Sequence, residues 1–440
     1  MSDPLDPRAR ARQAVDTCVH CGLCLPSCPT YDVLRWEGDS PRGRLFQMRG
    51  VLEGTIPLTH PLLSRHLDLC LDCRACETAC PSGVVYHAAL EFVRGELDRV
   101  TPAASGARWA RRLCRTVGSP RRLRMAGTAL RLSARAGLLR AAVRIGRRGW
   151  LGQAGRHLDL VASGVQGGVR RPAAARGLPR VPSPRERVGF LEGCVMGELM
   201  GETGQRAVAL LALSGAQVAV PADQGCCGAL HLHLGDREGA RRLARRTIDA
   251  FGRSGVELVV THSAGCGSAM KEYGVLLGDD PAYADRARRF SAGVRDASEY
   301  LASHLPQPRH PFPRRVVYQD ACHLRHAQGI SAEPRALIAA VPGLDLVETR
   351  HPDQCCGSAG SYNLTQPAMS EALLERKLDD LLATGAQVVV TANPGCLLQL
   401  RRGLARRSPA TAVVHLVDLL AAAHGVGEPG RMGAAGRPGS

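Results

Sequence analysis

The sequence predicts a multidomain α+β protein. We expect a helical, cysteine-rich N-terminal domain and a basic helical connector, followed by two duplicated α/β cysteine-rich domains. Three observations predict this fold class: cysteines crowd the first 100 residues, cysteine positions recur in the second half, and short β-branched runs alternate there with helical stretches. The chain of 440 residues also exceeds a single domain of roughly 100–200 residues.

Composition narrows the classes of function. No stretch approaches the roughly 20 apolar residues that span a bilayer, and the first residues lack the apolar region of a signal peptide, so we expect a cytoplasmic protein. In that reducing compartment, seventeen cysteines indicate metal binding rather than disulfides. The net charge of +17 would favour nucleic-acid binding. However, aromatic residues are only 4% of the chain and do not interleave with basic ones, so no nucleic acid is expected.

The first domain, residues 1–100, carries two cysteine runs of identical spacing. Each reads C-x2-C-x2-C-x3-C-P. In the bacterial two-cluster pattern, three close thiolates hold one 4Fe-4S cluster and the fourth reaches across to the other. The sequence therefore predicts a two-cluster ferredoxin-type domain. The ligands of the first cluster would be Cys18, Cys21, Cys24 and Cys80, and those of the second Cys70, Cys73, Cys76 and Cys28.

Structural zinc is the alternative for these thiolates. A zinc site needs four tetrahedral ligands, which two tandem runs with identical proline placement exceed. The gap of about forty residues between the runs favours a compact helical domain over a β-rich one. Within this gap we expect a turn at Pro41–Arg44, whose Arg42 and Arg44 either offset the negative charge of a cluster or are merely solvated. Tyr86 and His87 are expected to pack.

The connector, residues 101–186, is rich in Arg and nearly free of acids. Its Leu and Val residues recur at helical spacing, which predicts short helices that pack on a neighbouring domain. The alternative is a docking surface for a partner or for anionic lipid headgroups. Cys114 stands alone here and is expected to be inert. A Pro-rich linker, Pro172 to Pro184, ends the connector.

An internal repeat occupies the rest of the chain. Residues 187–310 and 311–424 each contain a single cysteine, a Cys-Cys-Gly triplet and a further cysteine in the same order. Strand-like runs at 217–220, 256–261, 344–348 and 387–391 alternate with helical stretches such as 235–251 and 367–382, which favours parallel α/β sheets. Cys266 and Cys396 should then lie just beyond strand carboxyl ends. Residues 425–440 are Gly/Pro-rich and expected to be disordered.

The repeated cysteines leave three interpretations open. They could bind additional clusters or another metal, form reversible redox thiols, or be buried small residues. A vicinal disulfide is disfavoured because adjacent cysteines strain the bridge geometry. The candidate metal or redox residues are Cys194, Cys226, Cys227 and Cys266 in the first repeat, and Cys322, Cys355, Cys356 and Cys396 in the second.

These motifs together resemble one family. Stretches such as Cys18-Val-His-Cys21-Gly, Pro41-Arg-Gly-Arg44, Leu191-Glu-Gly-Cys194, Gly225-Cys-Cys-Gly-Ala229 and Cys355-Cys-Gly-Ser-Ala-Gly360 are similar to the iron-sulfur subunit of bacterial glycolate oxidase, or glycolate dehydrogenase, over nearly the whole chain. The resemblance implies that flavin-containing subunits oxidise glycolate to glyoxylate, and that this subunit takes their electrons through two 4Fe-4S clusters to a quinone or other acceptor. It would then be a subunit of an oxidoreductase acting on CH-OH donors, with no catalytic residue of its own.

The resemblance extends to other proteins with Cys-Cys-Gly repeats. These are the iron-sulfur subunits of lactate and glycerol-3-phosphate dehydrogenases, and heterodisulfide reductases. In the reductases each repeat ends in C-x2-C and holds a noncubane cluster, whereas this chain has Ala269 and Gln399 at the last position. A reductase-type catalytic cluster is thus disfavoured. The resemblance also implies a cytoplasmic location, with peripheral association at the inner face of the membrane.

Overall fold

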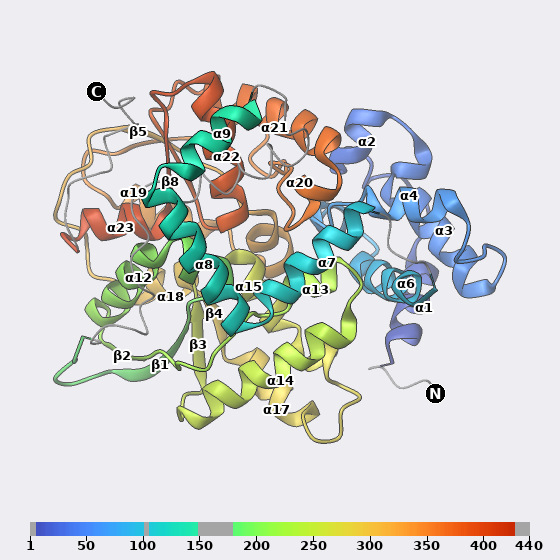
Figure 1. Ribbon diagram of the computed structural model, residues 1–440, viewed down its shortest axis with the longest axis horizontal. Helices are drawn as coiled ribbons and strands as arrows, with labels where there is room; N and C mark the ends of the chain where they lie inside the picture. Colours follow the sequence, from blue (N-terminus) through green and yellow to red (C-terminus); the bar gives the residue numbers. More distant parts are fainter. Residues whose placement is uncertain (1–5, 101–104, 148–178, 427–440) are drawn as a thin grey trace.

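A computed structural model describes residues 6–100, 105–147 and 179–426 (Figure 1). The chain forms a helical N-terminal domain, a helical connector and two α/β units, which confirms the predicted fold class. The predicted domain boundaries stay a prediction. Most of the Pro-rich linker and all but two residues of the predicted tail lie outside the described residues.

The regular secondary structure of the N-terminal domain consists of helices alone within its described residues. Its helices are α1 Pro7–Thr17, α2 Pro29–Leu34, η1 Glu37–Asp39, α3 Pro41–Glu53, α4 Pro61–Asp68, α5 Ala75–Thr78 and α6 Tyr86–Val100. Proline occupies the first turn of α1, α2, α3 and α4, where its missing N–H costs no hydrogen bond. The prediction of a turn at 41–44 is wrong. Pro41 instead begins α3, because the Ser40 hydroxyl accepts a hydrogen bond from Gly43 N and caps the helix.

The described residues of the connector form three helices, as its periodicity predicted. They are α7 Ser105–Val117, α8 Pro120–Arg135 and α9 Leu138–Arg147. Leu113, Val117 and Leu123 pack in one buried apolar cluster with residues of the first repeat. The connector therefore covers part of that repeat.

The first repeat contains a four-stranded parallel sheet of order β2-β1-β3-β4. Its strands are β1 Glu186–Leu191, β2 Ala216–Ala219, β3 Leu258–Thr261 and β4 Val294–Asp296. Its helices are α11 Cys194–Leu199, α12 Gly201–Leu213, α13 Ala229–His233, α14 Arg237–Arg253, α15 Ala264–Lys271, α16 Tyr273–Leu276, α17 Ala284–Ala292 and α18 Ala297–His304.

The second repeat has the same topology, with sheet order β6-β5-β7-β8 and all pairs parallel. Its strands are β5 Arg315–Tyr318, β6 Asp345–Val347, β7 Val388–Thr391 and β8 Ala412–His415. Its helices are η3 His323–Ala327, α19 Ala332–Ala339, α20 Tyr362–Thr365, α21 Pro367–Leu382, α22 Pro394–Arg407 and α23 Leu416–Ala423. The four predicted strands are present, and the equal strand orders confirm the duplication.

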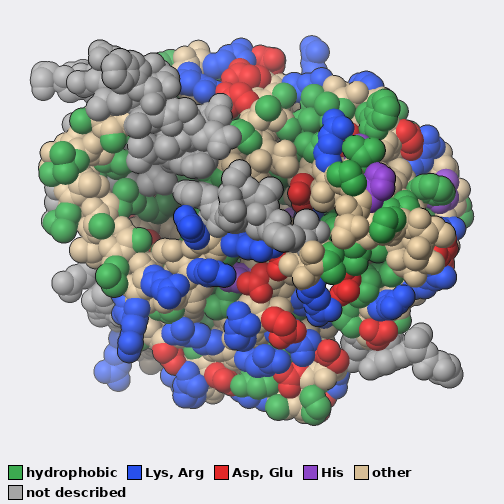
Figure 2. Space-filling model, turned by 45° about the vertical axis from the view of Figure 1, so that its right-hand side comes forward, with side chains coloured by type: hydrophobic (Ala, Val, Ile, Leu, Met, Phe, Trp, Pro, Cys, Tyr) green, Lys and Arg blue, Asp and Glu red, His purple; other side chains and the backbone are tan. Residues whose placement is uncertain are grey.

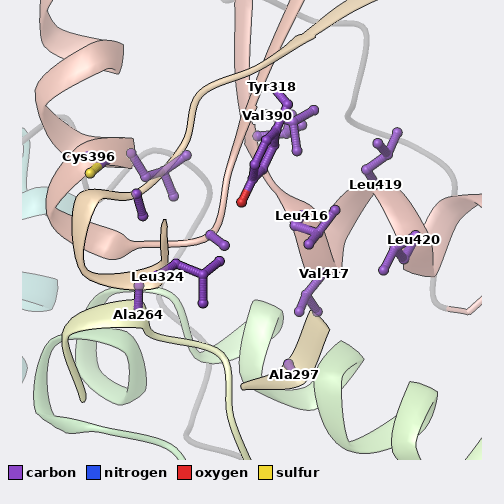
Figure 3. Close-up of a cluster of buried hydrophobic side chains, with 14 of the residues drawn as sticks. Ala264, Ala297, Tyr318, Leu324, Val390, Cys396, Leu416, Val417, Leu419 and Leu420 are labelled. Atoms are coloured by element: carbon purple, nitrogen blue, oxygen red, sulfur yellow. The ribbon is translucent and has the colours of Figure 1, made fainter. Parts of the chain in front are cut away.

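The two repeats share one hydrophobic core. Ala264 and Ala297 of the first repeat belong to the same buried cluster as Tyr318, Leu416 and Val417 of the second (Figure 3). His415 Nε2 also lies 2.9 Å from the carbonyl oxygen of His262 across this contact. Because burial of apolar surface drives association, the repeats form a single body that holds both cysteine-rich edges in place.

Candidate metal centres

The two cysteine runs of the N-terminal domain adopt the same backbone conformation. The residues two and four positions after the first cysteine have positive φ in both runs: His20 at 55° and Gly22 at 86°, Asp72 at 53° and Arg74 at 62°. Left-handed residues at these positions curl the chain tightly, so that successive cysteines face one centre. At Gly22 the positive φ is what favours glycine, since the nearest atom to a Cβ there would be Arg42 Nη1, the end of a flexible side chain.

Each run contributes to two cavities. The first cavity encloses about 430 Å³, partly open to solvent, and the second about 320 Å³. Cys76, Pro41 and Tyr86 line both, so the cavities are neighbours. The other cysteines that line the first cavity are Cys18, Cys21, Cys24 and Cys80, and those that line the second are Cys28, Cys70 and Cys73. The four cysteines predicted for each cluster therefore line one cavity, but Cys76 lines both, so the division into two ligand sets stays a prediction. The soft thiolate donors fit iron-sulfur clusters.

Hydrogen-bond donors surround the sulfurs of the second cavity. The backbone N–H of Asp72 lies 3.4 Å from Cys70 Sγ, and the Tyr86 hydroxyl donates to the same sulfur at 3.7 Å. Arg44 is buried, and its Nη1 lies 3.9 Å from Cys28 Sγ. Donors and positive charge near cluster sulfurs raise the reduction potential. Tyr86 therefore does more than pack, and its position after the second run was the available sequence signal.

Burial keeps several of these thiols protonated in the absence of metal. It raises the pKa of Cys24 to about 11, and raises the pKa values of Cys73 and Cys76 well above the ordinary thiol range. Metal ions bind the thiolate, so a cluster that binds here must displace these protons.

The repeated cysteines gather at the carboxyl edges of the two sheets. Cys194 and Cys266 follow β1 and β3, and Cys322 and Cys396 follow β5 and β7, so each pair starts from adjacent parallel strands. The prediction that Cys266 and Cys396 lie beyond strand carboxyl ends is confirmed.

Within each repeat the four thiols form a chain of contacts in the same order. Cys194 Sγ lies 3.7 Å from Cys226 Sγ, and hydrogen bonds continue from Cys226 to Cys227 and from Cys227 to Cys266. In the second repeat the corresponding chain runs through Cys322, Cys355, Cys356 and Cys396. All of these cysteines are free, so each site offers four thiols for a metal centre or for redox chemistry.

Backbone geometry explains why glycine follows the two cysteines in each Cys-Cys-Gly triplet. Gly228 and Gly357 have φ of 89° and 80°. A Cβ on Gly357 would lie 2.5 Å from the carbonyl oxygen of Ser370, and one on Gly228 would lie 3.2 Å from the Cα of Ala240. The glycine thus lets the cysteine loop lie directly on the following long helix, α14 or α21.

Gln399, at the position of the absent fifth cysteine, has a structural role. Its Nε2 donates to Ser370 Oγ at 2.9 Å, and its Oε1 accepts from Asn363 Nδ2 at 3.3 Å. The side chain is fully buried. These bonds tie α22 to α20 and α21.

The second cysteine run lies at the junction of the N-terminal domain with both repeats. Asp72 is buried, with its Oδ2 3.2 Å from His233 Nδ1 of the first repeat and its carbonyl oxygen 2.8 Å from His323 Nε2 of the second. The two imidazoles stack with centroids 5.2 Å apart. Arg74 forms an ion pair with Glu272. The sequence could not reveal this junction, since its members lie far apart along the chain and belong to no motif.

Cys73 brings the second cavity against the second cysteine-rich site. It packs in one buried cluster with Cys322 and Cys355. The Tyr362 hydroxyl closes this contact by donating to the Leu69 carbonyl at 2.9 Å. The charge of Cys322 adds to burial in raising the pKa of Cys73, which reflects how near the two sulfurs lie.

These sites define an iron-sulfur electron-transfer protein. Residues 14–84 match the family described as 4Fe-4S dicluster domain, and residues 188–271 and 316–401 match the cysteine-rich domain. The chain carries iron-sulfur clusters of the dicluster type beside duplicated cysteine-rich domains.

Full-length relatives identify the family. The chain is 38% identical to the probable glycolate oxidase iron-sulfur subunit of Bacillus subtilis, over 93% of this chain and 94% of that protein. It is 32% identical to the glycolate oxidase iron-sulfur subunit of Escherichia coli, over 96% and 97%. A fumarate reductase (CoM/CoB) subunit of Methanothermobacter marburgensis is 28% identical over 81% and 72%. The chain belongs to the family of glycolate oxidase iron-sulfur subunits.

The part of the chain that the structure describes contains no helix long and apolar enough to cross a membrane.

Proposed function

We propose that this chain is the electron-transfer subunit of a glycolate dehydrogenase complex. Flavin-containing subunits would oxidise glycolate to glyoxylate, and this chain would carry the electrons to a quinone or another acceptor. The observation that carries the proposal is the pair of adjacent cysteine-lined cavities between an exposed surface and the second cysteine-rich site. The two relatives above, matched end to end, are named as iron-sulfur subunits of glycolate oxidase.

The proposed ligand sets follow the cavity linings. Five cysteines line the first cavity, and Cys76, the one that also lines the second cavity, is assigned to the second set by the crossing pattern. We assign Cys18, Cys21, Cys24 and Cys80 to the outer cluster, and Cys70, Cys73, Cys76 and Cys28 to the inner cluster. When bound, the clusters would supply one-electron carriers, while the protein's part is to hold, insulate and tune them.

The outer cluster faces the electron donor in this proposal. Cys21 is exposed, and the apolar side chains of Val19 and Leu23 at the cavity mouth are 69% and 60% exposed. Phe46, 64% exposed, contacts the ring of His20 beside the same mouth. Figure 2, in which this domain is turned forward, shows apolar side chains gathered on it. Exposed apolar groups around a redox centre favour a protein partner.

The inner cluster leads toward the second cysteine-rich site. Cys73 shares a buried cluster with Cys322 and Cys355, and the loop that carries it is bonded to both repeats. Electrons that arrive at the outer cluster would therefore move inward, away from solvent. The location we propose is the cytoplasm, with peripheral attachment at the membrane where a quinone is the acceptor.

The test is anaerobic purification of the chain with the products of its neighbouring genes. Iron, sulfide and zinc are measured, and low-temperature EPR spectra are recorded after dithionite and after glycolate. We expect at least about eight iron atoms per chain from two cubane clusters, and cluster reduction by glycolate. Zinc without sulfide would contradict the cluster assignment. Reduction by lactate or glycerol 3-phosphate but not glycolate would reassign the substrate and leave the electron-transfer role intact.

A further inference from the structure

The two cysteine-rich sites differ in what surrounds them. Aligned on the Cys-Cys-Gly triplets, His231 of the first repeat corresponds to Gly360 of the second. The first site is also covered by α7 of the connector, which brings a further cysteine, Cys114. The Cys114 thiol and the His231 imidazole are therefore two additional donor groups at the first site that have no counterpart in the second repeat.

Cys114 lies against the first site. Leu113 and Val117 flank it on α7 and pack in one buried cluster with Cys194 and Cys226. The Cys114 thiol is 3% exposed, and its Sγ has a long contact of 3.7 Å to the carbonyl oxygen of Leu230, the residue before His231. Cys226 adds to burial in raising the pKa of the Cys114 thiol.

His231 is a second, independent sign of a ligand at this place. Its side chain is 6% exposed, and its Nδ1 is buried without a hydrogen-bond partner. The imidazole lies against the Cys226 thiol. Its other nitrogen, Nε2, lies 3.9 Å from Asp236 Oδ2. The end of α7 closes over the ring, since a Cβ on Gly118 would lie 3.3 Å from His231 Nε2. A buried imidazole nitrogen without a partner is costly unless something binds it.

We propose that Cys114 is a fifth cysteine ligand of an iron-sulfur centre at the first cysteine-rich site, with the His231 imidazole facing the same centre. The other ligands are Cys194, Cys226, Cys227 and Cys266. Within the repeat the fifth sulfur is absent because Ala269 occupies its position. A helix from outside the repeat supplies it instead. This inference rests on the proposed function, and it makes the connector part of a metal site.

The experiment compares iron and sulfide contents of anaerobically purified variants of the full complex. Cys114→Ser and Cys226→Ser should lose the same amount of iron and the same EPR component. Cys322→Ser, in the second site, serves as the matched control and should leave that component in place. The signal of the two ferredoxin-type clusters reports that each variant has folded.

The variant Leu113→Ala distinguishes an effect of packing from an effect of ligation, because it removes a packed side chain of α7 but keeps every sulfur atom. This variant should retain the centre. The inference is wrong if Cys114→Ser keeps the wild-type iron content, if Leu113→Ala loses as much iron as Cys114→Ser, or if the wild-type chain holds only about eight iron atoms. In each of these cases an intact dicluster signal would leave the proposed function standing.

Discussion

Arg44 should set the potential of the inner cluster. Its guanidinium is buried, lines the second cavity and lies 3.9 Å from Cys28 Sγ. A unit charge about 6 Å from the cluster centre, at an effective dielectric constant of about 20, contributes about 2.8 kcal/mol. For a one-electron couple this energy corresponds to about 120 mV. Removing the charge by Arg44→Met should therefore lower the potential of that cluster.

Asp39 limits this effect. It lies 3.6 Å from Arg44 Nη2 and is also bonded to His66. Its charge, about 8 Å from the cluster, contributes about 2.1 kcal/mol of the opposite sign, so the Arg44–Asp39 pair together shifts the potential by only about 30 mV. Redox titrations followed by EPR should thus show a decrease between these limits. The outer cluster serves as an internal reference, and Arg44→Lys, which keeps the charge, as the matched control. An unchanged or raised potential in an iron-replete Arg44→Met variant would refute the reasoning.

Three further predictions address ligation, the connector and pH. Cys80→Ser should abolish the EPR signal of the outer cluster and spare the inner one, and Cys28→Ser should do the reverse; loss of the same signal in both would contradict the crossed ligand sets. Replacing the exposed connector arginines by Gln should weaken pelleting with anionic vesicles at low salt without loss of iron, whereas Lys replacements should not. Those arginines are Arg112, Arg115, Arg121, Arg122 and Arg124. Burial raises the pKa of Asp296 to about 6. The free energy of unfolding should therefore fall by up to about 3 kcal/mol as pH rises from about 4 to 6, because the folded protein must then bury an ionised carboxylate. Asp296→Asn keeps a capping oxygen but cannot ionise, so the melting temperature of this variant should rise relative to that of the wild type between pH 4 and pH 7. A difference in melting temperature that does not change with pH would disprove the assignment.

The cysteine pattern allowed much of the architecture to be predicted. Spacing alone predicted the crossed ligand sets that line the two cavities, because three closely spaced cysteines must face one centre. The duplication and the strand carboxyl edges also followed from sequence, since local apolar runs determine the strands. The edge strands β4 and β8 were not predicted.

Long-range contacts were beyond sequence reasoning. Cys114 was expected to be inert, but tertiary packing places its thiol 3.7 Å from the Leu230 carbonyl oxygen, on a helix whose Leu113 and Val117 pack with Cys194 and Cys226. The arginines at 42 and 44 were treated alike, yet they differ. Arg42 pairs with Glu37 and is partly exposed, while Arg44 is fully buried beside Cys28. Helical phase separates them, because two residues along α3 turn the side chain to the opposite face.

The duplication explains why the inner cluster sits where it does. His233 and Tyr362 occupy equivalent positions, each seven residues after the first cysteine of its Cys-Cys-Gly triplet. His233 bonds to Asp72, and Tyr362 donates to the Leu69 carbonyl. The two repeats thus hold the loop that carries Cys70 from two sides, through residues at corresponding positions. Within the described residues, the first cysteine run forms no corresponding hydrogen bond with either repeat, and its Cys21 is exposed. The duplicated scaffold therefore fixes the second cysteine run in the interior and leaves the first at the surface, which is the arrangement that the proposed relay from a docked partner requires.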